Sequence, residues 1–249
     1  MHSEEWIYGL NPVLEALRAG RNIKTVYVSS GRNEKAGRVR QEAEKRGIPV
    51  ETPAFTFFNG RFPKGHQGVA ARVVQKGYLS LDELLAIPAK RNEPALFVIL
   101  DGIEDPRNFG AILRSADAAG VHGVVIQSHR AASLGPEVAK TSAGAVEYIP
   151  VSMVPNIKHA MREMKEKGIV VVGSESGAYM ALWEADLAVP LALVIGSEGK
   201  GARRTVKENC DIMVNIPTRG KINSLNASVA AGIVLFEILR QRSIKNKKL

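Results

Sequence analysis

The chain has 249 residues, of which 45% are hydrophobic and 24% are charged. This composition is typical of a globular protein of one or two domains, and it excludes a disordered, collagen-like or disulfide-scaffolded chain. Lysine and arginine outnumber aspartate and glutamate by 34 to 25, and the resulting net charge of +9 favours a polyanionic partner, nucleic acid before membrane, with solubility alone as the alternative.

Residues 1–75 are predicted to form a small α/β domain. Asn11-Pro12 predicts a helix start and Gly20 its end, because Asn caps helices and Pro fits the first helical position. The expected elements that follow are strands over 24–29, 48–52 and 69–74 and a basic helix over 34–46. Residues 59–68 are too rich in Gly and Pro for regular structure. They combine cations with Phe62, so this loop either contacts RNA or forms a solvated turn.

Residues 76–93 are predicted to be a linker with one short helix, which a capping box at Ser80 and Glu83 would begin. Beyond it, over residues 94–249, short apolar runs alternate with helices. We expect strands over 95–100, 123–127, 169–173, 191–195 and 211–216, and helices over 112–119, 154–167 and 224–242. Continuous Val, Ile and Leu strands that alternate with helices predict an α/β fold with a parallel sheet covered on both faces.

The cysteine content indicates a reducing compartment. Cys210 is the single cysteine, so no internal disulfide can form and no Cys-x-x-Cys pair can hold zinc. The N-terminus is acidic without a long apolar run behind it, and no stretch approaches the ~18 apolar residues of a membrane span. We therefore expect a cytoplasmic protein with no metal site and no membrane segment.

The glycine-rich segment 196–201 follows a predicted strand, as a phosphate-binding loop would. A Walker loop needs Gly-Lys-Ser/Thr, but Ala202-Arg203 follows Gly201 here. The dinucleotide-binding fingerprint lacks its third glycine. A nucleotide-dependent oxidoreductase is therefore disfavoured, although these glycines would let a ligand approach the backbone closely.

Three polar clusters follow the ends of predicted strands, where ligands bind in open α/β sheets. They span residues 101–114, 195–201 and 216–228. Asn108 and Arg114 of the first share a helix face, Glu198 of the second lies between glycines, and Ser224 and Asn226 of the third crowd the start of the last helix. Taken singly, the Ser and Asn residues are expected to be helix caps. The alternative to a functional role is a solvated loop for Glu198 and a surface ion pair for Arg114.

Together, the clusters resemble the three signature motifs of the SpoU/TrmH family of RNA ribose 2′-O-methyltransferases, in the SPOUT superfamily. The matching patterns are Asn108-x-Gly-x-x-x-Arg114, then Leu193-Val-Ile-Gly-Ser-Glu-Gly-x-Gly201, then Ile216-Pro-x-x-Gly220 with Ser224-Leu-Asn-x-Ser228. Residues 7–17 and 66–68 resemble the substrate-binding domain of the branch that methylates a guanosine ribose in large-subunit (23S) ribosomal RNA.

The resemblance implies an RNA-binding domain over residues 1–75 and a methyltransferase domain over 94–249. It implies a deep trefoil knot in the latter, against which general topology rules would argue. It also implies a homodimer and the cofactor S-adenosylmethionine. The cofactor would be held by the backbone around Gly196, Ile216 and Leu225, with Ser174 lining the same pocket.

The resemblance further assigns catalysis to Asn108, Arg114, Glu198, Ser224 and Asn226. A guanidinium holds its proton too tightly to act as a base, so we expect Arg114 to clamp the target phosphate and stabilise the developing alkoxide. Asn108 would hold that arginine or the ribose. Ser224 and Asn226 would orient the nucleotide and the cofactor, and Glu198 would keep its loop in shape.

The expected reaction is methylation of a ribose 2′-OH, that of a guanosine in 23S ribosomal RNA. The alternatives are a tRNA 2′-O-methyltransferase of the same family and an RNA-binding protein without catalysis. Binding of S-adenosylmethionine would separate the enzymes from the latter.

Overall fold

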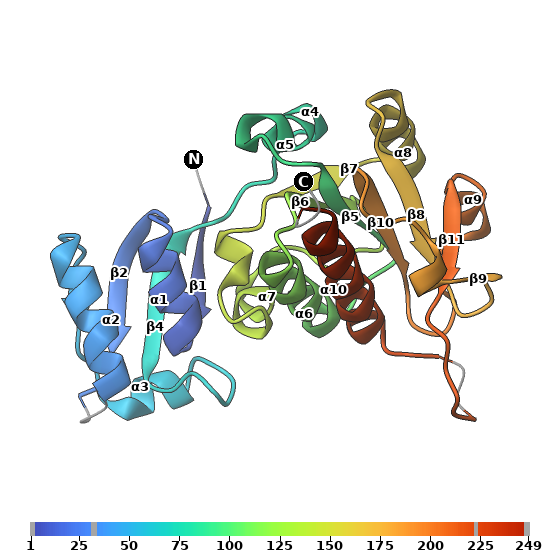
Figure 1. Cartoon of the computed structure of the whole chain (residues 1–249). Coiled ribbons are helices and arrows are strands. Elements are labelled where there is room, and N and C mark those ends of the chain that lie inside the picture. Colours follow the sequence, from blue (N-terminus) through green and yellow to red (C-terminus); the bar gives the residue numbers. More distant parts are fainter. Residues whose placement is uncertain (1–2, 31–33, 222–223, 247–249) are drawn as a thin grey trace. The chain divides into compact units, whose positions relative to one another are not determined.

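A computed structural model describes residues 3–30, 34–221 and 224–246, and it divides the chain into two compact units (Figure 1). The first unit comprises Met1–Gly77 with Ser133–Tyr148, and the second comprises Tyr78–Ala132 with Ile149–Leu249. Neither unit is therefore continuous in sequence, and residues 133–148 group with the front of the chain.

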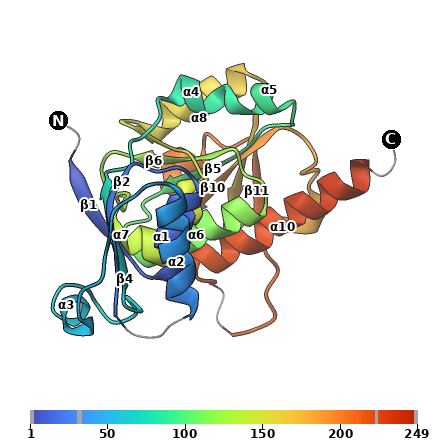
Figure 2. The ribbon, with the colours of Figure 1, turned by 90° about the vertical axis from the view of Figure 1, so that its left-hand side faces the viewer.

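The first unit is built on a four-stranded mixed sheet. Its strands, in spatial order, are β1 (Glu4–Tyr8), β4 (Val69–Val74), β2 (Ile23–Val28) and β3 (Val50–Glu51). β4 pairs antiparallel with β1 and β2, whereas β3 pairs parallel with β2. The helices are α1 (Leu10–Arg18), α2 (Glu34–Lys45), α3 (Phe55–Asn59), α7 (Pro136–Thr141) and the 3₁₀ turn η1 (Ala145–Glu147). α1 and α2 lie against the same face of the sheet (Figure 2).

The first helix of this unit begins two residues earlier than predicted. α1 starts at Leu10 with Gly9 as its N-cap residue at φ 99°, so the prediction that Asn11 caps the helix was wrong. The Leu10 N–H donates instead to the side-chain Oε1 of Gln67 at 3.2 Å. A distant residue therefore satisfies one of the unpaired backbone donors at the helix start.

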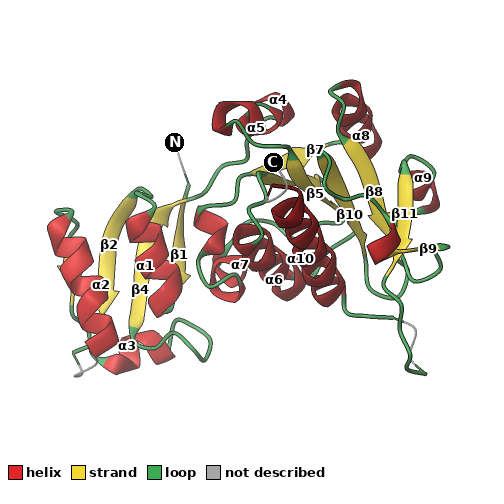
Figure 3. Cartoon of the chain, in the orientation of Figure 1, coloured by secondary structure: helices red, strands yellow, loops and turns green. Residues whose placement is uncertain are grey.

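The second unit contains a seven-stranded parallel sheet with helices on both faces (Figure 3). The spatial order of the strands is β7 (Val151–Val154), β6 (Gly123–Gln127), β5 (Leu96–Asp101), β10 (Leu191–Gly196), β8 (Val170–Ser174), β11 (Ile212–Asn215) and β9 (Met180–Ala181). The helices are α4 (Leu81–Leu85), α5 (Ile87–Arg91), α6 (Pro106–Ala118), α8 (Ile157–Glu166), the 3₁₀ turn η2 (Leu182–Glu184), α9 (Arg204–Lys207) and α10 (Ala227–Asn246). The predicted α/β class with a parallel sheet is confirmed.

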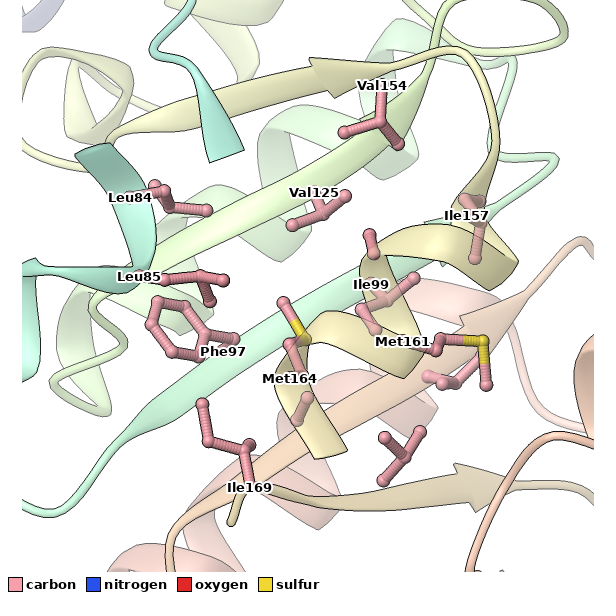
Figure 4. Close-up of a cluster of buried hydrophobic side chains, with 14 of the residues drawn as sticks. Leu84, Leu85, Phe97, Ile99, Val125, Val154, Ile157, Met161, Met164 and Ile169 are labelled. Carbon is pink, nitrogen blue, oxygen red and sulfur yellow. The ribbon is translucent and has the colours of Figure 1, made fainter. Parts of the chain in front are cut away.

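The core of this unit follows from its central strands. Every residue of β5 and β10 is buried, so alternate side chains enter the core on opposite faces of the sheet. On one face, Phe97 and Ile99 pack against side chains of α4 and α8 such as Leu84 and Met161 (Figure 4). On the other face, α6 and α10 pack against each other.

Two predictions for this unit need correction. Residues 76–93 contain two helices rather than one, and Leu84 of α4 is fully buried in the core, so this segment is more than a linker. The predicted capping box is present: the Glu83 N–H donates to Ser80 Oγ at 3.3 Å. The helix predicted over 154–167 begins only at Ile157, because residues 151–154 pair with β6 as a strand and Asn156 caps the helix.

Candidate active site

The predicted polar clusters meet at one edge of the parallel sheet. β5, β8, β10 and β11 run in the same direction, so the loops that follow them lie at their common carboxyl ends. A pocket at this edge is lined by residues from three of these loops and from the start of α10. Ser174, Gly196, Ile216 and Leu225, the four predicted cofactor-binding residues, all line it, as do Ser224 and Glu198.

The loop after β10 is folded tightly beside this pocket. The N–H of Ser197 donates to the Gly201 carbonyl at 3.1 Å, and the Gly201 N–H donates back to Ser197 O at 2.9 Å. The chain then returns so closely that a Cβ on Gly196 would lie 1.9 Å from the backbone nitrogen of Ala202. Glycine is therefore required at position 196 for steric reasons.

A buried carboxylate anchors the end of the same loop. Asp101, 3% exposed at the end of β5, accepts hydrogen bonds from the Arg203 backbone N–H and from its Nε, both at 2.8 Å. Arg203 Nη2 also donates to Gln127 Oε1 at 2.7 Å. Sequence reasoning assigned no role to these three residues. A polar residue directly after a buried strand was a usable signal for Asp101, whereas the partners depend on the tertiary fold.

One side chain connects all three clusters. Asn226 Nδ2 donates to Asn108 Oδ1 at 3.0 Å and also to Glu198 Oε1. Asn226 Oδ1 accepts from the backbone N–H groups of Ser228 at 2.9 Å and Val229 at 3.3 Å, so it also caps α10. The expectation that Asn226 is a helix cap is therefore confirmed for its amide oxygen, while its amide nitrogen bonds side chains of the two other clusters.

A second cavity adjoins the first at the same loop. Its volume is about 600 Å³, and it is lined by Asn108, by Gln127 at the end of β6, by Arg130 beyond that strand, and by residues of the 197–203 loop. Glu198 lines both cavities. A volume of this size is in the range of small-molecule and nucleotide sites.

Arg114 lies apart from these groups. It is on the exposed side of α6 and lines neither cavity. Within the described part of the chain it has no hydrogen-bond or ion-pair partner. The alternative prediction, that Arg114 forms a surface ion pair, therefore finds no partner residue in that part either.

The fold and the two adjoining cavities define an α/β enzyme with a ligand pocket built from loops at the strand ends. Residues 95–236 match the SpoU rRNA Methylase family, and residues 6–79 match the domain described as RNA 2′-O ribose methyltransferase substrate binding. The chain belongs to the SpoU methyltransferase family, whose members use S-adenosylmethionine.

Similar proteins span nearly the whole chain. A TrmH family tRNA/rRNA methyltransferase of Bacillus subtilis, YacO, is 42% identical over 240 residues, which cover 96% of each chain. The SpoU methyltransferase AviRb of Streptomyces viridochromogenes, solved with its cofactor AdoMet, is 28% identical with a TM-score of 0.81, covering 97% of this chain and 91% of that one. An AdoMet-bound rRNA methyltransferase of Sinorhizobium meliloti is 27% identical with a TM-score of 0.77, covering 95% and 87%.

No helix in the described part of the chain is both long enough and apolar enough to cross a membrane.

Proposed function

We propose that this protein methylates the ribose 2′-OH of a guanosine in 23S ribosomal RNA. The observation that carries the proposal is the pair of hydrogen bonds from Asn226 to Asn108 and Glu198, called here the Asn226 junction. It joins the pocket lined by the predicted cofactor-binding residues to the cavity lined by Asn108. In a methyl transfer, the acceptor oxygen, the methyl carbon and the donor sulfur must lie in one line. The two cavities adjoin each other, since Glu198 lines both, and would therefore hold the donor and the acceptor side by side.

The first pocket fits S-adenosylmethionine by its mixture of surfaces. Ile195, Ile216 and Leu225 supply apolar contacts for the adenine, and the hydroxyls of Ser174 and Ser224 can hydrogen-bond the ribose or the amino-acid part. When bound, the cofactor supplies an electrophilic methyl group on a sulfonium. The absence of a side chain at Gly196 lets the backbone of Gly201 and Ala202 pack directly against the end of β10 beside this pocket.

The acceptor nucleotide would enter the second cavity. Because Asn108 Oδ1 is occupied by Asn226, the Asn108 Nδ2 group remains able to donate to the ribose hydroxyl oxygen. Glu198 Oε1 accepts from Asn226, which leaves its second oxygen able to accept a hydrogen bond from the hydroxyl and to orient it. For Arg114 the proposal rests on the family resemblance: it lines neither cavity, but its guanidinium has no partner among the described residues and would bind the target phosphate and stabilise the alkoxide.

A homodimer is part of this proposal. α10 is apolar on two sides, and its exposed side carries Val229, Ile233, Phe236 and Leu239. A helix that is apolar beyond its intrachain face is typical of a subunit interface. A second subunit would also bring further residues near the exposed site of the first.

The names of the relatives favour a second candidate, a tRNA substrate, since YacO is described as a tRNA/rRNA methyltransferase. The test is transfer of radiolabelled methyl groups to purified 23S ribosomal RNA and to bulk tRNA, followed by mapping of 2′-O-methylated positions in ribosomal RNA from cells that lack the protein. We expect one guanosine of 23S RNA to lose its methyl group. Transfer to tRNA alone would replace this proposal by the second candidate, and transfer to neither RNA would contradict both.

A further inference from the structure

The face of the four-stranded sheet opposite α1 and α2 carries an aromatic cluster. Its buried members are Tyr8, Tyr27, Phe58 and Phe62, packed around Ala70. Trp6 and Phe57 lie at the edge of the cluster and are only partly buried. The strand register places Trp6 opposite Arg72, and Tyr8 and Tyr27 opposite Ala70, so these strand residues share one face.

In the 59–68 loop, for which the sequence allowed RNA contact, three residues have structural roles. Phe62 is 9% and His66 5% exposed, and His66 Nε2 lies 3.1 Å from Asn59 Oδ1. Gln67 binds the first N–H of α1. Because these groups are buried or already bonded, an RNA-contacting surface on this unit has to use other side chains.

Arg61 of the same loop is exposed and lies over aromatic rings. Its guanidinium carbon is 4.6 Å from the centroid of the Phe57 ring and 5.4 Å from that of the Trp6 ring. Within the described part of the chain, Arg61 has no carboxylate partner. Trp6 also packs against Tyr27, with ring centroids 5.0 Å apart and ring planes tilted by 48°. The result is a group of packed aromatic rings beneath an exposed arginine.

The charge around these rings favours an anionic partner. Residues 1–77 hold 13 Lys and Arg against 7 Asp and Glu, so this part of the chain accounts for a net charge of +6 out of +9. The acidic side chains on the same sheet face are Glu4, which pairs with Arg72, and Glu51, which lies opposite Tyr27 on the short strand β3. Lys64 adds a further exposed cation from the loop.

We propose that Trp6, Phe57 and Arg61 form a stacking platform for a nucleobase in a single-stranded segment of the RNA substrate. The proposal rests on the proposed RNA methyltransferase function and names the surface by which the front unit holds that RNA. Single-stranded bases bind proteins by stacking on aromatic rings and on arginine planes, while nearby cations contact the phosphates. Because the Trp6 and Phe57 ring planes are inclined to each other by 62°, a base would stack on one of the two rings and contact the edge of the other. Arg61 would move from the rings to the adjacent phosphate or stack on the base.

Tryptophan fluorescence tests stacking directly. The chain has two tryptophans, so a Trp183→Phe variant leaves Trp6 as the single reporter. We expect a single-stranded RNA of about 12 nucleotides, long enough for a stacking site, to quench its emission. A duplex of the same sequence should quench it much less. Unchanged emission while the single strand demonstrably binds would overturn the proposal, and binding of duplex alone would do the same.

Affinity for 23S ribosomal RNA provides the second readout, on the full-length protein. Arg61→Ala should weaken binding about 5- to 150-fold, the range of one lost base-stacking contact. It should also lower the slope of log affinity against log salt concentration by about one if the phosphate contact is lost. Arg46→Ala is the matched control, since Arg46 is an exposed cation at the end of α2 that pairs with Glu42.

The two variants separate the proposal from the function on which it rests. If the wild-type protein methylates RNA but Arg61→Ala and Arg46→Ala lose affinity equally, the platform is excluded and the enzyme activity stands. If the wild-type protein transfers no methyl group to any RNA, the proposed function fails, while RNA-dependent quenching of Trp6 would still report the binding surface.

Discussion

Asn226 performs two tasks with one side chain, and the two can be separated by substitution. Asn226→Asp keeps an oxygen that caps α10 but loses both donated hydrogen bonds and places a second carboxylate beside Glu198. Because a hydrogen bond to a charged group contributes about 1.5–3 kcal/mol to stability, we expect urea unfolding to show a loss of about that size. Cofactor affinity in calorimetry should fall about tenfold or more, because Glu198 in the pocket loses its partner. Asn226→Ala should lose the cap as well, at a cost of about 1 kcal/mol. If Asn226→Asp kept the wild-type cofactor affinity, the hydrogen bonds that Asn226 donates would have no role in cofactor binding.

Arg114 tests the chemical step. If it binds the phosphate and stabilises the alkoxide, Arg114→Ala should lower the single-turnover rate by ~10²–10³-fold, as loss of one donor to a developing oxyanion does. Cofactor binding should stay nearly unchanged, because Arg114 does not line the first pocket. Arg114→Lys keeps the charge but loses the planar fork and should recover only part of the rate.

The control for this series is Arg162→Ala, which removes another exposed helical arginine, on α8. Near-normal turnover in Arg114→Ala would exclude the residue from the mechanism.

His122 links stability to pH. It is 1% exposed; its Nδ1 accepts from the Leu96 N–H at 3.1 Å, so its Nε2 donates to Glu93 Oε2 at 3.0 Å. Burial lowers the pKa of His122, a shift that Glu93 only partly opposes. Below the ordinary histidine pKa of about 6.5, the unfolded chain therefore binds the proton more readily, and the free energy of unfolding falls as pH drops.

Urea unfolding at about pH 7.5 and about pH 5.5 measures this effect of His122 protonation. In His122→Asn, the amide oxygen can accept from Leu96 without titrating, so the difference between the two pH values should shrink. His159→Asn, an exposed change on α8, should keep the wild-type difference. Equal pH dependence in all three proteins would show that His122 does not contribute.

At the level of elements, the loop after β10 depends on Gly196. A Cβ there would meet the backbone of Gly201 and Ala202 at 2.1 and 1.9 Å, and no side-chain movement can relieve that clash. Gly196→Ala should therefore abolish cofactor binding and destabilise the second unit by about 3 kcal/mol or more. Gly177→Ala is the control, because nothing lies within 4 Å of its added Cβ. Calorimetry and thermal unfolding of both variants check this, and normal cofactor binding by Gly196→Ala would contradict it.

The elements that were predictable are those whose patterns are local. The buried strands at 96–101, 191–196 and 123–127 are continuous runs of apolar residues, and their type follows from length and composition alone. β1 (Glu4–Tyr8) was missed because it begins with two glutamates, which do not fit the pattern of a strand. It forms a strand because it pairs with β4, a distant segment of the chain. α3 was missed because Phe55–Asn59 becomes a helix only where its aromatics pack on the sheet.

The site shows the same limit. The convergence of Asn108, Glu198 and Asn226 was predicted because all three follow strands of one parallel sheet. The bonds between Asp101 and Arg203 could not be predicted, since the two residues are separated by 102 positions and no local pattern pairs them. The trefoil knot implied by the family resemblance stays a prediction, because strand order does not define threading.

For the whole molecule, the outer side of α10 decides the expected oligomeric state. Ala231, Val234, Leu235 and Ile238 are buried within the chain. The exposed apolar residues, with their exposed fractions, are Val229 (49%), Ile233 (39%), Phe236 (50%) and Leu239 (37%). Their spacing of three and four residues forms a continuous stripe along one side of the helix. A second copy of the chain that covers this stripe would remove a contiguous apolar surface from water.

We therefore expect the wild-type protein to sediment as a dimer at micromolar concentration. Phe236→Glu should shift it to monomer, because a carboxylate at the centre of the stripe would have to be buried without a partner. The matched control is Phe55→Glu, in which a phenylalanine of nearly the same exposure, 51% against 50%, is changed on the first unit. If the active site needs both subunits, methyl transfer should fall in parallel with dimer content for Phe236→Glu and should recover at high protein concentration. A fully active monomer, or dimers unaffected by Phe236→Glu, would show that the stripe on α10 serves another purpose.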